Sequence, residues 1–357
     1  MIKILHSADW HLDAPLGGFT SSQRQFLRQQ MLLLPDKIAD LAIREGCEIC
    51  LLSGDLFDGP YTRESCDAVM RALERMEIPV FISPGNHDYV SSQSPWTREI
   101  WPANVHIFKK QAISSVEVPE LDCRVYGAGY ESMECPRLLE DFHADCQERH
   151  ALLVLHADPT AVSSPYCPVT PAEIRDAGFD YAALGHIHSA GRFGAGAGMC
   201  AWPGCPMGRG YDETGVKGVL IVELEESARI RFVPLDVPRF FDETVTVGDN
   251  PVGAILDLLP ARGSDDFYRI HLTGEVRGDT LERLQGKFDA YPNLCLLNET
   301  VAAGDLWETA GQDSLEGIYF DILHRATEGQ DEQTVRDLEL AAKISRRILQ
   351  GREVELP

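Results

Sequence analysis

Polar side chains that can bind metal ions stand directly after five apolar strands predicted in the first half of the chain. In chain order these donors are Asp9, His11, Asp55, Asn86, His156, His186 and His188. Functional sites of open α/β sheets form where the strands end, so we expect the seven side chains to lie close together.

Imidazole nitrogens combined with carboxylate and amide oxygens suit Mn²⁺, Fe²⁺ or Zn²⁺ better than Mg²⁺ or Ca²⁺ alone. Seven donors are too many for one ion and suit two, provided that one carboxylate bridges. Asp55 is the natural bridge because it has no close ligand neighbour in the sequence. Two ions about 3.5–4 Å apart can bind a phosphate and stabilise both oxygens of an in-line displacement. The pattern therefore predicts phosphoester hydrolysis.

Each motif taken alone has an ordinary structural explanation. Gly54 and Asp55 are common in turns, and a single histidine such as His156 is more often a satisfied core residue. The turn "PGNHD" is different, because turn chemistry accepts proline, glycine, asparagine and aspartate but does not ask for His87. It is the whole set, in order and after predicted strands, that indicates a metal site.

The elements that must position these donors alternate between apolar strands and amphipathic helices. Strands are predicted at 1–9, 47–55, 80–86, 150–158 and 179–188, followed by a hairpin over 218–235. Helices are predicted at 22–46, as one helix or as two joined near Pro35, and at 63–76 and 170–178. Apolar strands separated by helices indicate an α/β core whose sheet is covered on both faces.

The pattern changes near residue 239, and we predict three segments, 1–238, 239–305 and 306–357. The middle segment has the pattern of a small βαβαβ domain, with a second helix over 279–291. The last segment is helical: Asp313 and Glu316 have the spacing of a capping box, and an apolar stripe follows, interleaved with basic residues.

Composition narrows the class of protein. The 357 residues carry 32 basic and 56 acidic side chains, a net charge of −24 that repels polyanions at long range. The ten cysteines have no framework spacing, so we expect reduced thiols. The N-terminal stretch contains His6 and Asp9 where a signal peptide would be apolar, and no apolar run is long enough to span a membrane. We expect a cytoplasmic protein without a membrane segment.

The motifs "DWH", "GDLFD", "GNHD", "LH" and "GHIH" together resemble those of the calcineurin-like metallophosphoesterases. The stretches "ILHSADWHLDAPL", "FDYAALGHIH" and "WPGCPMGRGYDETGVKGVLIVEL" resemble the SbcD and YhaO group of DNA-repair exonucleases. The resemblance implies an α/β (α+β) fold, a calcineurin-like phosphoesterase sandwich with helices on both faces of the sheets. In it the middle segment would be a capping domain beside the active site.

Carried over to this chain, the resemblance implies two ligand sets that share one residue. One ion would be bound by Asp9, His11, Asp55 and His188, and the other by Asp55, Asn86, His156 and His186. His87 would face the scissile phosphate as a catalytic residue, and Asp88 would orient the imidazole of its neighbour. Asp58 stands where SbcD-like sequences carry a histidine, so the role of that position does not transfer; a turn residue and a partner of the ligands both remain open.

The resemblance also implies a function and partners. We expect a metal-dependent DNA exonuclease using two divalent ions, Mn²⁺ first and Fe²⁺ or Zn²⁺ as alternatives. Endonuclease activity on hairpins or single strands, in addition to the exonuclease activity, is left open. The expected partners are DNA, a coiled-coil ATPase of the SbcC type bound through the C-terminal helices, and a second copy in a homodimer. A general small-substrate phosphodiesterase or nucleotidase, and a scaffold for DNA ends or the ATPase, remain as alternatives. Polarity of digestion stays open.

Overall fold

The computed structural model describes residues 1–193, 199–247, 250–260, 264–276, 284, 286–302 and 306–349. The chain forms two compact units, each described by itself below. The first comprises Met1–Asp242 and Asp265–Tyr268, and the second Glu243–Ser264 and Arg269–Pro357. The expected capping segment and the C-terminal helices both fall largely in the second unit, so these two units do not test our division of the chain into three segments, which stays a prediction.

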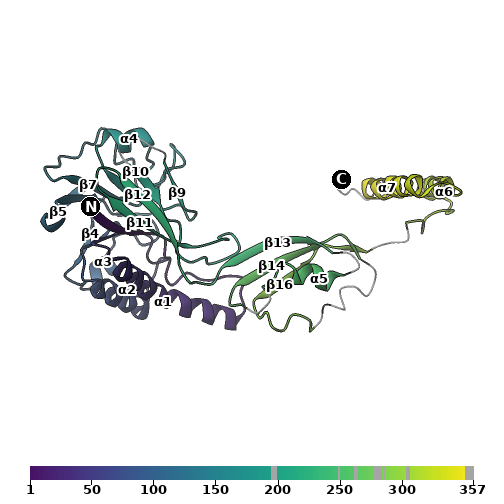
Figure 1. The fold of residues 1–357 in the computed structure, drawn as a ribbon, viewed down its shortest axis with the longest axis horizontal. Coiled ribbons are helices and arrows are strands. Elements are labelled where there is room, and N and C mark those ends of the chain that lie inside the picture. The colour runs from purple at the N-terminus through teal and green to yellow at the C-terminus, as the bar shows by residue number, and fades with distance from the viewer. Residues whose placement is uncertain are drawn as a thin grey trace. The chain divides into compact units, whose positions relative to one another are not determined.

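The first unit is built on two six-stranded sheets (Figure 1). The first sheet has the order β12-β11-β1-β2-β3-β4: Ala228–Pro234, Gly218–Leu224, Ile2–Ser7, Ile49–Leu52, Val80–Ile82 and Val105–Ile107. The second has the order β5-β6-β7-β8-β10-β9: Ser114–Val118, Cys123–Gly127, His150–Leu155, Tyr181–Leu184, Met199–Trp202 and Gly191–Arg192. The strands that carry the site, β1 to β3 and β7 to β8, run parallel to one another within each sheet.

Alternating strand residues divide the core into layers. Ile4 and Leu51 of the first sheet pack against Val125 and Leu152 of the second, which closes a sandwich between the sheets. The alternate residues of the first sheet, including Leu5, face the helices. Such alternation follows from the two-residue period of a strand. The predicted sandwich of sheets covered by helices is confirmed.

Helices α1 (Ser21–Glu45) and α2 (Arg63–Arg75) lie side by side against the first sheet (Figure 1). Helix α1 begins with a Thr20 capping box and ends at Gly46, which adopts the left-handed φ of 66° that glycine favours. The structure resolves the alternative at Pro35, because one helix runs through this residue. Shorter helices complete the unit: α3 (Pro95–Arg98), the 3-10 turn η1 (Pro119–Leu121) and α4 (Pro171–Asp176).

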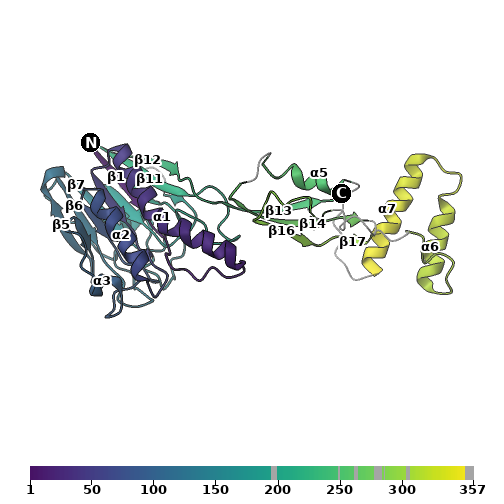
Figure 2. The ribbon, with the colours of Figure 1, turned by 90° about the horizontal axis from the view of Figure 1, so that it is seen from below.

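The second unit contains a small sheet with the order β13-β14-β16, of which β13 and β14 begin in the first unit. Its elements are β13 (Phe240–Thr246), α5 (Pro251–Leu256), β14 (Phe267–Thr273) and β16 (Leu294–Asn298), with a parallel pair of β15 (Glu275–Val276) and β17 (Val301–Ala302). The helix predicted over 279–291 lies mostly outside the described residues. The chain continues into the helix pair α6 (Leu315–Ala326) and α7 (Glu332–Leu349), drawn in yellow in Figure 2.

Among the helices that the structure describes, none is long and apolar enough to cross a membrane.

Candidate metal centre

Strand register brings the predicted donors to one edge of each sheet. Ser7, Leu52 and Ile82 are aligned across β1, β2 and β3, and each strand ends within a few residues of a predicted ligand. In the second sheet Leu155 is aligned with Leu184; His156 follows Leu155 directly, and His186 follows Leu184 after one glycine. Since parallel strands deliver their carboxyl ends to the same edge, the donors meet there.

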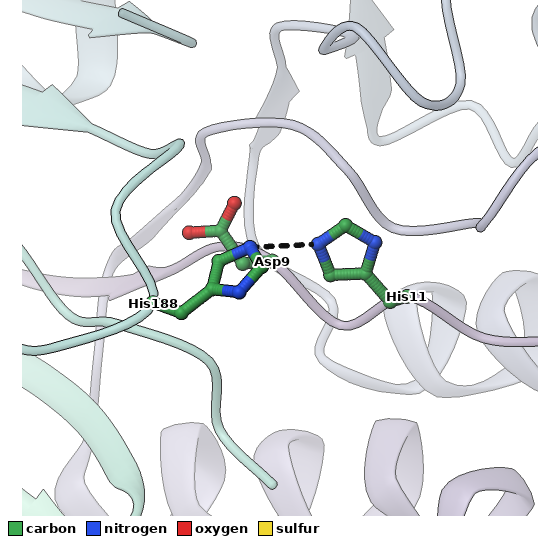
Figure 3. A group of neighbouring side chains, drawn as sticks. All are labelled: Asp9, His11 and His188. Carbon is green, nitrogen blue, oxygen red and sulfur yellow. Dashed lines mark hydrogen bonds between the residues drawn. The ribbon is translucent and has the colours of Figure 1, made fainter. Parts of the chain in front are cut away.

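The outer part of this cluster consists of Asp9, His11 and His188 (Figure 3). The Nε2 atoms of His11 and His188 lie 3.1 Å apart. Nδ1 of His188 lies 2.7 Å from Oε1 of Glu213 and 3.1 Å from Nη2 of Arg209; the shorter contact is to a carboxylate that can only accept, so this nitrogen carries the ring proton. Nε2 of His188 is then a lone-pair donor. Two ligand atoms about 2.1 Å from one ion and at right angles would lie about 3.0 Å apart, which the pair matches.

The inner part is oriented by the backbone instead. His156 donates Nδ1–H to the carbonyl oxygen of Ser53 at 2.8 Å, which leaves its Nε2 as the lone-pair nitrogen. That Nε2 lies 2.9 Å from Oδ1 of Asn86 and 3.4 Å from Oδ2 of Asp55. His156 is fully buried and Asn86 nearly so. The three donor atoms therefore converge in the buried interior.

Asp55 lies between the two parts. Its Oδ2 is 3.7 Å from Nε2 of His11 on the outer side and 3.4 Å from Nε2 of His156 on the inner side, while Oδ1 accepts the backbone N–H of His87 at 2.9 Å. Burial raises the pKa of this carboxyl, but His156, His11 and His87 together outweigh it and lower the pKa. An ionised carboxylate is thus available to both sides, as a bridging ligand requires.

Two further observations show that the cluster fits divalent ions. Oδ2 of the fully buried Asp9 has no hydrogen-bond partner among the described residues, although Oδ1 accepts the backbone N–H of His186 at 3.0 Å. An unpaired buried oxygen is costly unless an ion or water satisfies it. Burial lowers the pKa of His186 to about 4, so its imidazole is neutral and can act as a ligand.

The backbone is held in unusual conformations at these positions. Asp9, His11, Asp55 and His186 all have positive φ angles of 56°, 47°, 51° and 83°. Non-glycine residues adopt such angles at a cost of about 1–3 kcal/mol each, and they persist where the surrounding structure enforces them. A side chain at Gly85 would collide with Oδ1 of Asp55 and Nδ1 of His156, so glycine allows the turn to approach the ligands.

His87 lies at the exposed mouth of the cluster and contacts Asp58. Its Nδ1 is 2.6 Å from Oδ1 of Asp58, and this hydrogen bond, opposed by burial, raises the pKa of the imidazole. The same oxygen is 3.5 Å from Nδ1 of His11. Of the two roles left open for Asp58, the structure supports that of a partner: it touches both a predicted ligand and the predicted catalytic histidine.

Asp88 points away from this pair. Its Oδ1 accepts the backbone N–H of Gly85 at 2.7 Å and its Oδ2 that of Leu56 at 2.8 Å, which ties the two turns together. Burial and the nearby Asp55 charge raise the pKa of Asp88 to about 7. The contact that we expected Asp88 to make with the imidazole is made by Asp58 instead.

Sequence reasoning missed Glu213 altogether. The carboxylate is buried, binds His188 and also accepts from Arg209, whose Nε lies 3.2 Å and Nη2 2.5 Å from its oxygens. The contact cannot be seen in the sequence because Glu213 and His188 are far apart in the chain, and the only available signal was the pair of acidic residues, Asp212 and Glu213, within "GRGYDETG". His6 is fully buried, with ring contacts to Tyr181 and Ser53, and burial lowers its pKa to about 3. It supports the strand behind the site.

The fold and this cluster define a metallophosphoesterase. The sequence profile of the calcineurin-like phosphoesterase family matches residues 2–190, more than half of the chain, and the chain belongs to that family. This membership confirms the resemblance seen in the sequence and implies a hydrolase of phosphoric esters.

Among curated sequences the chain is similar to the "uncharacterized metallophosphoesterase YhaO" of Bacillus subtilis (strain 168). The two are 29% identical over 240 residues, which cover 62% of this chain and 57% of that protein. The chain thus spans little more than half the length of this relative.

Two solved structures are also similar. A dimetal phosphatase from Danio rerio matches with a TM-score of 0.41 and 14% identity, over 65% of this chain and 96% of that one. The protein TT1561 of Thermus thermophilus matches with a TM-score of 0.39 and 13% identity, over 61% and 93%.

Proposed function

We propose that the chain is a phosphodiesterase that uses two divalent ions and acts on DNA as an exonuclease. The observation that carries the proposal is the shared position of Asp55, whose Oδ2 lies within 4 Å of imidazole nitrogens on both sides. Two ions bound by this set would polarise a phosphate and stabilise the attacking and leaving oxygens. Mn²⁺ is the first candidate, although mixed nitrogen and oxygen ligands also accept Fe²⁺ and Zn²⁺.

The residues around the ligands prepare the proton transfer. His87 is partly exposed at the mouth, and its hydrogen bond to Asp58 favours the protonated ring. With Nδ1 directed at Asp58, the Nε2–H of His87 is free to be donated to the leaving oxygen. Asp58 therefore acts as a positioning residue for His87.

DNA as the substrate is supported by the sequence segment 202–224, which resembles the SbcD group. This segment supplies Glu213, the residue that orients the ligand His188. The second unit, with its small sheet, gives a surface that a small substrate does not need. The net charge of −24 opposes DNA binding, since affinity for DNA comes largely from basic side chains. Four positive charges from two ions, and basic surface from a partner, would offset it.

The proposed ATPase partner is supported by the apolar surface of α6 and α7. Leu315, Ile322 and Ile348 are 87%, 63% and 61% exposed. Side chains of this kind, when they gather in a patch, usually mark a contact with another protein. We further propose a homodimer and a cytoplasmic location. The ten cysteines are all unpaired, as a reducing compartment requires.

The test is cleavage of end-labelled duplex and single-stranded DNA with Mn²⁺, with Mg²⁺ and with chelator. Asp55→Asn and His87→Ala serve as the inactive variants. Mn²⁺-dependent shortening of DNA that both substitutions abolish would support the proposal. Hydrolysis of bis(p-nitrophenyl) phosphate by a protein that leaves DNA intact, with or without the ATPase, would favour a small-substrate phosphodiesterase.

A further inference from the structure

A cavity of about 330 Å³ adjoins the metal centre, and His87 forms part of its wall. The other lining residues come from the loops after β2 and β3 and from α3, and they include Tyr61, Tyr89 and Arg98. The seven predicted ligands are not among these lining residues. The cavity therefore begins at the imidazole that we assign to the leaving oxygen and extends away from the ligands.

The walls of the cavity combine flat apolar groups with polar edges. Tyr61 and Tyr89 are both lining residues: the Tyr61 ring is fixed by its hydroxyl, which donates to Oε1 of Glu99 at 2.8 Å, and the half-buried Tyr89 packs against the core beside the second sheet. Phe57 packs against the same ring with a centroid distance of 5.9 Å. Fixed aromatic rings stack nucleobases with little sequence preference. A volume near the lower end for ligand pockets suits a single nucleoside.

Arg98 adds a positive charge to this lining. It is exposed and has no ion pair within the described ranges, whereas Arg63 pairs with Asp67 and Glu99. An unpaired guanidinium beside an aromatic cavity suits a phosphate, to which arginine donates two parallel hydrogen bonds. The cavity thus combines the imidazole, the aromatic rings and a cation.

We propose that this cavity binds the nucleoside that departs with the oxygen protonated by His87, together with the next phosphate along the strand. The inference rests on the proposed function, because it needs His87 to face the leaving group. Tyr61 and Tyr89 stack on the base, and Arg98 binds the following phosphate. The chain then recognises its substrate by the group that it releases as well as by the scissile phosphate.

Binding of thymidine 3′,5′-bisphosphate in the presence of chelator tests the site without catalysis. This probe carries a phosphate on both sides of the nucleoside, so it serves for either polarity, and without ions the acidic ligand cluster does not attract it. We expect saturable binding by calorimetry. Tyr89→Ala and Arg98→Ala weaken it by about 10-fold or more, as loss of a stacked base or a charged hydrogen bond predicts.

Tyr89→Phe, which keeps the ring, and Arg71→Ala, an exposed arginine on α2, serve as matched controls and leave binding within about 2-fold. Arg98 is exposed, so its variant keeps the test valid even if Tyr89→Ala does not fold. Absence of binding to the unaltered protein, or binding by both alanine variants that is as tight as binding by the unaltered protein, overturns the proposal.

Hydrolysis of two diesters separates this inference from the proposed function. The dinucleotide pTpTp fills the cavity with its leaving group, whereas bis(p-nitrophenyl) phosphate does not. We expect Arg98→Ala to lower kcat/KM for pTpTp by about 10-fold and to leave the aryl diester unchanged. Equal effects on both diesters overturn the cavity's role. If neither diester is hydrolysed while Arg98-dependent binding persists, the proposed function fails and the nucleoside site stands.

Discussion

The two parts of the metal centre are oriented by different means. On the inner side the backbone carbonyl of Ser53 fixes His156, and the surrounding donors are buried. On the outer side two carboxylates orient the imidazoles: Glu213 orients the predicted ligand His188, and Asp58 orients the predicted catalytic residue His87. A contact from a backbone carbonyl persists whatever side chain its residue carries, whereas a contact from a carboxylate is lost when that residue is substituted.

This difference implies that the inner part is fixed by the fold and the outer part can be tuned by substitution. In the proposed function the substrate reaches the cluster from the side of His87, whose side chain is 41% exposed, against 34% for His188. Changes in the outer carboxylates should therefore alter affinity and pH response while the protein stays folded. Changes in the inner turn should affect folding itself.

Asp55 belongs to both parts, and its substitution should have the largest effect. In Asp55→Asn the bridging charge is lost, so we expect bound metal to fall from two ions to at most one and phosphodiesterase activity to fall by on the order of 10³-fold. Metal content after gel filtration and hydrolysis of bis(p-nitrophenyl) phosphate measure both. Two retained ions with near-normal activity would show that Asp55 does not bridge.

Gly85→Ala tests the rigidity of the inner part. The new methyl group would collide with Asp55 and His156, so we expect a loss of about 1–3 kcal/mol in the free energy of unfolding. Gly17→Ala is the matched control, because nothing lies within 4 Å of the methyl group that it adds. Denaturant unfolding measures the free energy of unfolding of both variants. Equal values would mean that the turn can shift to accommodate the added methyl group.

Glu213→Gln should weaken one ion and spare the other. The substitution removes the charge that holds His188 in its tautomer, and loss of such a partner typically reduces metal affinity by about 10–100-fold. Mn²⁺ titration by calorimetry should resolve one weakened and one unchanged site. Glu148→Gln is the control for general destabilisation, because Glu148 is a largely buried carboxylate that forms an ion pair with Arg124. Equal weakening of both ions would contradict the division into two parts.

Asp58→Asn should have the smallest effect and a characteristic pH dependence. The Asp58 carboxylate raises the pKa of His87, so its removal lowers that pKa. A proton donor stops working as the pH rises through its pKa, and the alkaline fall in kcat should therefore begin at lower pH in the variant. We expect a loss of about 10-fold at neutral pH. Asp67→Asn, at a half-buried carboxylate paired with Arg63, should leave the profile unchanged; an identical shift in this variant would mean that the effect does not come from the contact between Asp58 and His87.

The meeting of the predicted donors could be foreseen from the sequence because residues with metal-binding side chains follow the ends of the strands along the chain. Asp9, Asp55 and His156 each stand within a few residues of a buried strand, and the parallel pairing of these strands brings their ends to the same edge of each sheet. Partners from distant segments could not be predicted in this way. Glu213 reaches His188 only through the tertiary approach of the loop before β11.

Asp88 shows a different limit of sequence reasoning. Its position next to His87 suggested a contact with the imidazole, yet neighbours in a turn point in different directions. The carboxylate is turned toward backbone amides, including those of Gly85 and Leu56. In contrast, the continuous helix through Pro35 was one of two open alternatives, and buried contacts of Leu34 and Ile38 on either side favour the single helix.

The unpaired oxygen of Asp9 has a consequence for the folding of the chain. A buried carboxylate oxygen without a partner among the described residues destabilises the metal-free protein, and ions that satisfy it bind the folded state but find no such site in the unfolded chain. Free metal concentration then becomes a variable of thermal stability: an ion at about 1,000 times its Kd adds about 4 kcal/mol. The melting temperature of this protein should rise with each tenfold increase in Mn²⁺, so metal supply would govern its lifetime as well as its activity.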